Sequence, residues 1–140
     1  MIEQNDCGIL IKQIHSEMEK NANNSLRQDD ITMAQMTALI TLSQAEDSQM
    51  EQKQLERTLH IAQSTAAGIV KRLEQKGFIE SFTSTKDKRV KVIRITRSGM
   101  ECCYKAEVNM QKAEATLTAA LTETERSILR SLLQKIRNSF

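Results

Sequence analysis

The 140-residue sequence contains no proline and no tryptophan, only four glycines, and one tyrosine with three phenylalanines. This composition disfavours collagen-like chains, low-complexity linkers and loop-rich β-sandwiches, and it favours helices, because proline and glycine are the residues that interrupt helices. No apolar run approaches the roughly 20 residues that a membrane-spanning helix needs. We therefore expect a globular, mainly helical chain with no membrane partner.

Cysteine is also scarce: there are three cysteines, an odd number, and no C-x-x-C pair. They predict neither a disulfide framework nor a zinc knuckle, so no metal or other cofactor is expected. The first ten residues carry acids where a secretory signal peptide carries basic residues, so secretion is not expected. The expected location is the cytoplasm, where thiols stay reduced.

Charge is distributed unevenly along the chain. Residues 71–97 hold nine basic and three acidic side chains, whereas the other 113 residues hold 11 basic and 15 acidic ones. A basic segment in an otherwise acidic chain predicts an anionic partner at one place. The alternative at this point is an ordinary solvated charged face.

Helical periodicity marks the first part of the chain. Apolar residues at spacing four predict an amphipathic helix over roughly 8–28, fraying toward the asparagines of 21–24. Thr32 and Gln35 form a capping-box pattern, so a second helix begins at Thr32 and ends in the polar loop 46–48.

Two short helices over 51–59 and 63–76 follow, and the few residues between them predict a helix–turn–helix that closes at Gly77. The period then changes, because 78–83 and 90–95 are rich in β-branched and aromatic residues around a polar, basic tip. These two runs predict an antiparallel hairpin. Since an isolated hairpin is marginally stable, it must pack on the preceding helices as a wing does.

The carboxyl-terminal third is helical again. Apolar and small residues at spacings of three and four predict a helical seam from Cys103 to Ala120. Thr122 and Glu125 form a second capping box, which opens a last helix with one apolar face. Apolar-faced helices at both ends predict a two-fold homodimer.

The predicted fold is mainly α with a small β-hairpin wing. We expect a single domain over 1–140, in which 31–97 form a winged helix-turn-helix DNA-binding lobe and 1–30 and 98–140 form dimerisation helices. In this layout the second helix of the helix-turn-helix enters a DNA major groove, and the hairpin tip reaches the adjacent backbone or minor groove.

The candidate DNA contacts follow from this layout. Small polar, side-chain-poor and basic positions on the second helix suit close approach to base edges and phosphates; they are Gln63, Ser64, Thr65, Ala67, Gly68, Lys71 and Arg72. The candidate contacts at the hairpin tip are Lys86, Asp87, Lys88, Arg89 and Lys91. We expect Asp87 to orient Arg89 by a charge-assisted hydrogen bond.

Two segments resemble the multiple-antibiotic-resistance regulator (MarR) family. Residues 87–99, from Asp-Lys-Arg through a strand to Thr-Arg-Ser-Gly, resemble its wing, and residues 64–79 resemble its recognition helix and following strand. The resemblance implies an obligate winged-helix homodimer on a pseudo-palindromic operator. It also implies a repressor released by a small phenolic, lipophilic or oxidising signal, with Arg89 in the minor groove.

Three positions depart from the family pattern. Ala62 stands where a serine or threonine N-cap is usual, His60 stands where the turn usually has glycine, and Glu56 stands where a small residue is usual. These departures predict a slightly strained helix-turn-helix.

The regulatory signal is less well defined by the sequence. A candidate pocket for a lipophilic or phenolic effector comprises His15, Met18, Met33, Met36 and Met100, since methionine adapts to varied apolar ligands, although core filling explains these methionines equally well. An alternative is a redox-sensing repressor that uses Cys7, Cys102 and Cys103. Another alternative is a winged-helix module that binds an acidic protein. No catalytic motif is present, so an enzyme is not expected.

Overall fold

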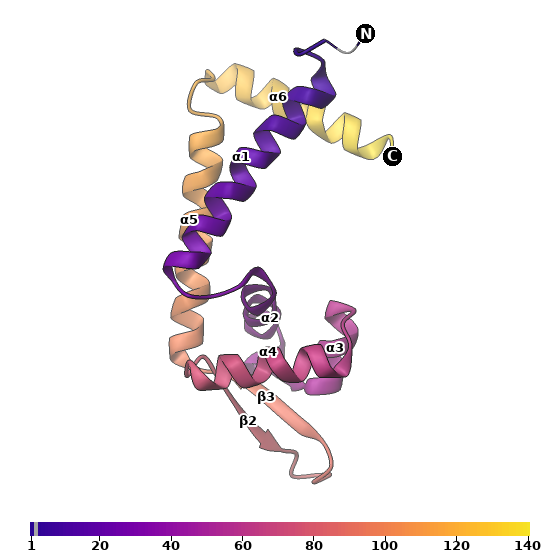
Figure 1. Cartoon of the computed structure of the whole chain (residues 1–140), viewed down its shortest axis with the longest axis vertical. Coiled ribbons are helices and arrows are strands. Elements are labelled where there is room, and N and C mark those ends of the chain that lie inside the picture. The colour runs from indigo at the N-terminus through magenta and orange to yellow at the C-terminus, as the bar shows by residue number, and fades with distance from the viewer. Residues whose placement is uncertain (2) are drawn as a thin grey trace. The chain divides into compact units, whose positions relative to one another are not determined.

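The computed structural model describes residue 1 and residues 3–140, which form two compact units, 1–106 and 107–140 (Figure 1). The first unit contains α1 (Cys7–Gln28), α2 (Met33–Ser43), a short 3-10 helix η1 (Glu46–Ser48), β1 (Gln49–Glu51), α3 (Gln52–Leu59), α4 (Gln63–Gln75), β2 (Ile79–Thr83) and β3 (Lys91–Ile95). Helix α5 (Arg97–Leu117) begins in the first unit and ends in the second, which also holds α6 (Glu123–Asn138). The predicted class, mainly α with a small β wing, is confirmed; the proposed division into dimerisation and DNA-binding segments stays a prediction.

Both predicted capping boxes are present. The Thr32 hydroxyl accepts from the backbone N–H of Gln35 at 3.1 Å, and the Gln35 side chain accepts from the backbone N–H of Thr32 at 3.2 Å. Thr122 and Glu125 make the same reciprocal pair at the start of α6, at 3.2 and 2.9 Å. Each box satisfies two N–H groups that a helix start otherwise leaves without partners.

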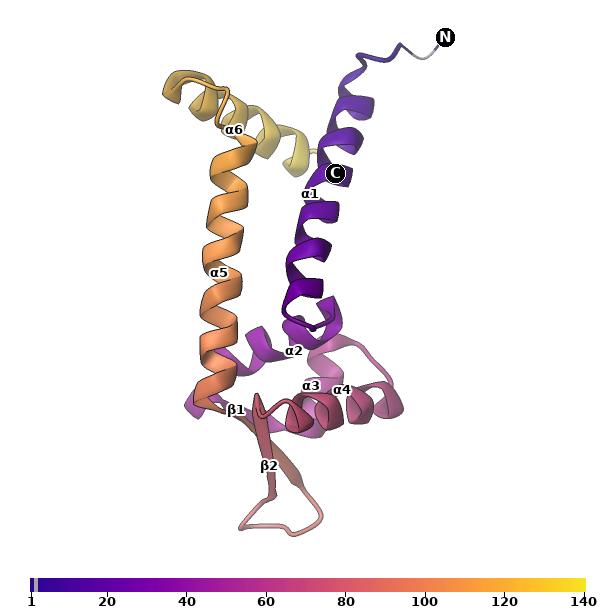
Figure 2. The ribbon, with the colours of Figure 1, turned by 60° about the vertical axis from the view of Figure 1, so that its left-hand side comes forward.

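The wing is a three-stranded antiparallel sheet with the order β1-β3-β2. The predicted hairpin is confirmed, with Phe82 opposite Val92. Strand β1 was not predicted: its three residues are too few to show a period, and they are held by pairing Met50 with Ile93 on the free edge of β3. The hairpin projects beyond the helices of the first unit (Figure 2).

Helix α1 agrees with the expected range of roughly 8–28, but two details of the helices differ from the sequence expectation. Helix α1 does not fray at residues 21–24 but continues to Gln28, because Leu26 in its last turn packs against the core. Helix α5 ends at Leu117, so Ala120 lies in the turn before α6 rather than on the helical seam. In both places tertiary contacts or a following cap override local propensity.

The core of the first unit lies between the helices and the inner face of the sheet. It is formed by Ile31, Met36, Ala38, Leu39, Leu42, Leu55, Ile69, Val70, Leu73, Ile79, Ile93 and Ile95. Cys102, Cys103 and Ala106 pack against it from the first turns of α5. Helix α4, the wing and the beginning of α5 therefore share one hydrophobic core, which joins them in one packed body.

The joint between wing and α5 depends on Thr96 and Gly99. The Thr96 hydroxyl donates to the carbonyl oxygen of Gly77 at 2.6 Å and accepts from the N–H of Gly99 at 3.2 Å, so it caps α5 while holding the end of α4. A Cβ atom at position 99 would collide with the carbonyl of Phe78. Gly77 itself has a φ of 76°, as predicted for the residue that closes α4.

Candidate nucleic-acid interface

Helices α3 and α4 form a tight helix–turn–helix. Leu55 of α3 and Ala66 of α4 are both fully buried, and the small Ala66 side chain allows the helices to approach closely. The turn requires a left-handed residue, His60, with φ 53° and ψ 45°. This conformation favours glycine, so His60 carries local backbone strain that the rest of the packing offsets.

The amino end of α4 has no side-chain cap. Residue Ala62 occupies the N-cap position in an extended conformation, and no side chain accepts from the first N–H groups of the helix. Unpaired N–H groups at the positive end of a helix suit a phosphate oxygen. The absent cap therefore leaves donors open at the end of α4 where an anion can approach.

The residues of α4 that the core buries show which face of this helix is turned toward solvent. Ala66, Ile69, Val70 and Leu73 face the core. All seven predicted contact residues of this helix (Gln63, Ser64, Thr65, Ala67, Gly68, Lys71 and Arg72) are exposed. At 100° per residue, Ser64, Gly68 and Lys71 lie near the middle of the exposed face. Because Ser64 and Gly68 are small, a DNA groove can approach this face closely, and Lys71 adds a positive charge to it.

Gln75 and Arg72 change this description of the exposed face of α4. Gln75 is exposed one turn after Lys71, on the same face, and was missed although its spacing of four from Lys71 is a sufficient signal. Arg72 lies toward the edge of the face and lines a cavity of about 390 Å³ together with Arg27, Asp30 and Met33. The structure therefore places Arg72 beside the α1–α2 junction as well as on α4.

The wing tip carries the predicted Asp87–Arg89 contact. The carboxylate of Asp87 accepts from Nε and Nη2 of Arg89 at 3.1 and 3.2 Å, and from the backbone N–H of Arg89 at 3.0 Å. These bonds from Arg89 lower the pKa of Asp87 from its ordinary value. The Arg89 side chain stays 91% exposed, so the guanidinium is oriented but free to meet a partner.

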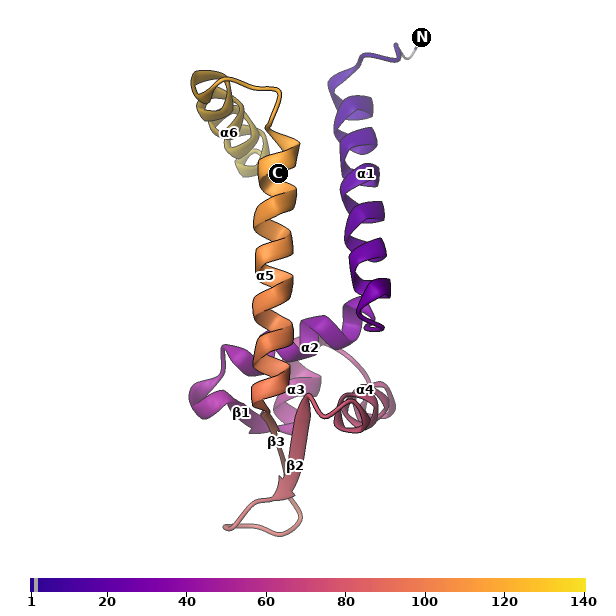
Figure 3. The same ribbon diagram turned by 90° about the vertical axis from the view of Figure 1, so that its left-hand side faces the viewer.

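The other tip cations differ from the basic residues of the stem. Lys86, Lys88 and Lys91 are exposed. In the stem, Arg94 donates to Glu80 at 2.6 Å and lies over the ring of Phe82, 5.0 Å from its centroid. The charge of Arg94 is therefore paired within the sheet, and the cations available to a partner gather at the tip. Figure 3, which looks nearly along α4, shows that the hairpin and α1 extend to opposite sides of the first unit.

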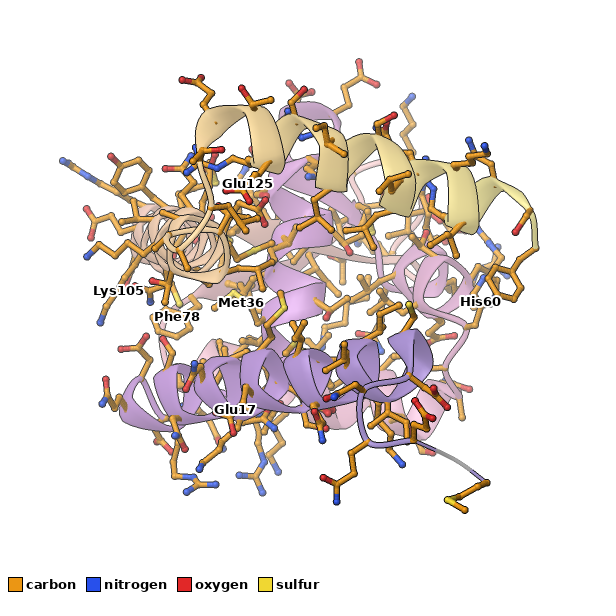
Figure 4. All side chains as sticks on the ribbon, turned by 90° about the horizontal axis from the view of Figure 1, so that it is seen from above. Glu17, Met36, His60, Phe78, Lys105 and Glu125 are labelled. Carbon is orange, nitrogen blue, oxygen red and sulfur yellow. The ribbon has the colours of Figure 1, made fainter. Side chains whose placement is uncertain are left out.

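The candidate effector residues are dispersed. His15 is exposed on α1, where Nε2 lies 4.0 Å from Oε2 of Glu19, and Met18 is exposed on the same helix. Met36 is buried in the core, where Figure 4 labels it, while Met33 lines the 390 Å³ cavity and Met100 is exposed on α5. Core filling accounts for Met36; the role of the others in ligand binding stays a prediction.

The three cysteines are free thiols. Cys7 is exposed, whereas Cys102 and Cys103 are half-buried. Burial raises the pKa of both Cys102 and Cys103 above the ordinary value, and for Cys102 the nearby charge of Asp29 adds to the rise. A raised pKa keeps a thiol protonated and slows its oxidation, which weighs against the redox alternative.

Two other kinds of site, a metal centre and a membrane span, bear on residues 1 and 3–140. Within that range, His, Cys, Asp and Glu do not gather in any group of three that could hold a metal ion. None of the described helices combines the length and the apolar character that crossing a bilayer requires.

Comparisons with known proteins match the chain to one family. The MarR family model matches residues 31–91, which run from the first core residue before α2 to the start of β3. The Bacillus subtilis regulator YwaE is 30% identical over 90 residues, which are 64% of this chain and 53% of YwaE, so the chain spans about half of that relative. The Escherichia coli transcriptional repressor MprA is 27% identical over 127 residues, covering 91% of this chain and 72% of MprA.

Solved structures agree over nearly the whole chain. A point mutant of MepR from S. aureus superposes with a TM-score of 0.88 at 27% identity, covering 95% of this chain and 97% of that one. The complex of S. aureus MepR with DNA matches with a TM-score of 0.67 at 27% identity, covering 96% and 98% of the two chains. Sequence and fold therefore agree from the helix-turn-helix through the wing and beyond it: residues 31–91 carry a MarR-family domain, and the chain is similar over nearly its whole length to MprA and to solved MepR.

Proposed function

We propose that the protein is a homodimeric repressor that binds a pseudo-palindromic operator in duplex DNA through α4 and the wing tip. One observation carries the proposal: the same rigid lobe presents the small, polar, uncapped face of α4 and an exposed arginine, Arg89, that Asp87 holds in place. A base-reading helix and a braced cation on one lobe are what groove recognition needs.

The residues divide by chemistry. Ser64, Thr65 and Gln75 carry polar groups able to hydrogen-bond base edges, whereas Lys71 and the tip lysines supply charge for phosphates. Arg89 enters the minor groove, where a fixed guanidinium meets the most negative potential of the duplex. The net positive charge of residues 71–97 makes this lobe attractive to DNA over a distance of about a Debye length.

Exposed apolar faces on α1 and α6 support the homodimer. Leu10, Ile11, Ile14 and Met18 are exposed on α1, and Ile128, Leu132, Leu133 and Ile136 are exposed on α6. Apolar stripes of this length favour burial against a second copy. Two recognition helices about 34 Å apart then reach successive major grooves on one side of the duplex.

Repression is proposed from the relatives. MprA is described as a transcriptional repressor, and MepR has been crystallised with DNA. A small lipophilic or phenolic effector that binds better to a dimer with another spacing of its recognition helices would release the operator by its differential affinity. The proposed location is the cytoplasm, where DNA is accessible and thiols are reduced.

The test begins with selection of duplexes from a random pool, followed by binding of the best duplex and of a random duplex at several salt concentrations. We expect a preference for the selected duplex of at least about a thousandfold and a steep linear fall of log affinity with log salt. Arg89→Ala weakens binding, and Lys12→Ala on α1 serves as the control. If Arg89→Ala binds as tightly as wild type, the assigned role of the wing is wrong.

The same measurement separates the second candidate, a winged-helix module for an acidic protein. Such a module binds duplexes weakly through charge alone and shows no preference for a selected sequence over a random one. A selection that yields no enriched duplex therefore favours the interaction module.

A further inference from the structure

Two adjacent carboxylates, Asp29 and Asp30, lie at the carboxyl end of α1. Asp29 is the C-cap, and its backbone N–H donates to the carbonyl of Leu26 at 3.2 Å. Asp30 follows in the left-handed region with φ 52°. Aspartate tolerates positive φ better than most residues with a side chain, but negative charge is unfavourable at the negative end of a helix. Local helix termination therefore does not explain two aspartates here.

Tertiary contacts explain them. Nζ of Lys76, the C-cap of α4, lies 3.2 Å from Oδ2 of Asp30 and also donates to its carbonyl oxygen. Nζ of Lys105, on α5, lies 2.5 Å from Oδ1 of Asp29. Figure 4 shows Lys105 on α5 near the carboxyl end of α1. The two aspartates thus join the end of α1 to the recognition helix and to α5.

The contacts form one cluster. The Lys76 side chain is 23% exposed and that of Asp29 is 24% exposed, so each pair has one half-buried partner. The charges of Asp29, Lys105 and Lys76 all act on the pKa of the half-buried Cys102 thiol, so these three groups lie within electrostatic reach of it. The next residue, Ile31, is buried in the core and fixes the loop that carries the carboxylates.

We propose that Asp29 and Asp30 are positioning residues for operator recognition: by holding Lys76 and Lys105 they set the angle between the recognition helix α4 and α5, and so the half-site spacing that the dimer accepts. This inference rests on the proposed function. The carboxylates touch no base; they act through the lysine at the end of α4. Ion pairs this exposed contribute little to folding stability, so their removal leaves the lobe folded.

The position of Lys76 at one end of α4 is important because a small tilt of this helix displaces its other end. The contact holds the carboxyl end of α4, whereas the reading residues Ser64 and Thr65 lie at its amino end. A 13-residue helix is about 20 Å long, so a tilt of about 10° after the contact is lost shifts one end relative to the other by about 3.5 Å. That displacement is about one base-pair step of the duplex.

The experiment compares Asp30→Asn with wild type on three operators that differ by one base pair inserted or deleted between the half-sites. The matched control is Asp47→Asn, because Asp47 is also exposed, also has a left-handed φ (56°), and loses the same charge. The readout is the ratio of affinities for the native and altered spacings, in which a general effect of charge on DNA binding cancels.

We expect Asp30→Asn to lower this ratio by about five- to tenfold, within the range of typical coupling between sites. Lys76→Met should reproduce the loss and Lys76→Arg should retain the wild-type ratio, while the thermal midpoint stays unchanged in all variants. An unchanged ratio for Asp30→Asn, or an equal drop for Asp47→Asn, overturns the positioning role alone. A wild-type protein with no preference among duplexes overturns the proposed function as well.

Discussion

Arg89 and Asp87 form a two-pronged contact at the tip of the wing, with Nε and Nη2 of the guanidinium donating to the two carboxylate oxygens at 3.1 and 3.2 Å. A third bond, from the backbone N–H of Arg89 to Asp87, closes the turn. The arginine is thereby restricted while its outer nitrogen remains exposed. Less conformational entropy is then lost when the guanidinium enters a groove.

Replacing Asp87 by asparagine tests this restriction. We expect Asp87→Asn to reduce the ratio of operator to random-duplex affinity by about tenfold, because a freed arginine still attracts phosphates but no longer points into the groove. Fluorescence anisotropy on both duplexes measures the ratio. Glu101→Gln is the control, since Glu101 also pairs with an arginine, Arg97, at 3.5 Å. Equal behaviour of the two variants would contradict the orienting role.

The same contact predicts a dependence on pH. The pKa of Asp87 is lowered, chiefly by the hydrogen bonds from Arg89, so the carboxylate is charged at neutral pH and the contact is lost only as the pH falls through the lowered value. The chemical shift of the Asp87 carboxyl carbon should titrate below the range of an unpaired aspartate. In Arg89→Ala the pKa of Asp87 should rise toward the ordinary value of an aspartate.

The face of α4 predicts two different defects. Lys71→Ala should weaken binding to all duplexes and reduce the salt slope by about one, as expected for loss of one phosphate contact. Gln75→Ala should leave the slope unchanged and alter the preference among operators, because an amide reads bases and carries no charge. A salt titration on operator variants measures both effects. A change of slope in Gln75→Ala is the outcome that contradicts this division.

Sequence reasoning recovered the elements whose signals are local. The capping boxes at Thr32 and Thr122, the left-handed Gly77 and the contact between Asp87 and Arg89 all depend on residues two or three positions apart or on one residue type. Such short-range chemistry is readable without a structure. The exposed positions of α4 were therefore predicted except for Gln75, while their contact with DNA stays a prediction.

Features that depend on distant partners could not be read. Strand β1 exists because Met50 meets Ile93 across the sheet, and α1 does not fray at residues 21–24 because Leu26 reaches the core. The Asp30–Lys76 contact joins residues 46 positions apart. A single sequence contains no signal for pairs at such separations.

Two glycines should respond oppositely to alanine. At position 99 a Cβ atom would collide with the Phe78 carbonyl, so Gly99→Ala should lower the free energy of unfolding by about 1–3 kcal/mol. At Gly68, within α4, the space for a Cβ atom is open, so Gly68→Ala should raise it by about 0.5–1 kcal/mol through helix propensity. Urea denaturation measures both. A change of the same sign in the free energy of unfolding of both variants would contradict the close packing at Gly99.

The thiols of Cys102 and Cys103 should react slowly. Burial raises the pKa of both, so little thiolate exists at pH 7 and alkylation by iodoacetamide should be slower at these positions than at the exposed Cys7. Mass spectrometry of peptides after timed labelling gives the three rates. Asp29→Asn should speed the reaction of Cys102, because the charge of Asp29 contributes to its raised pKa. Fast labelling of Cys103 in the native protein would revive the redox alternative.

The apolar face of α6 predicts an obligate partner. Leu132 is 52% exposed, and a glutamate there would lie within the apolar face that the proposed dimer buries. Leu132→Glu should therefore shift the sedimenting mass at micromolar concentration from twice the 15.9 kDa chain to a single chain. Met33→Glu, at an equally exposed methionine on α2, should leave the mass unchanged. A monomer carries only one DNA-binding lobe, so Leu132→Glu should also weaken operator binding by about 10²- to 10⁴-fold. The second half-site is then no longer bound at the high effective concentration that a dimer provides. A Leu132→Glu protein that stays dimeric and binds as wild type does would exclude α6 from the interface.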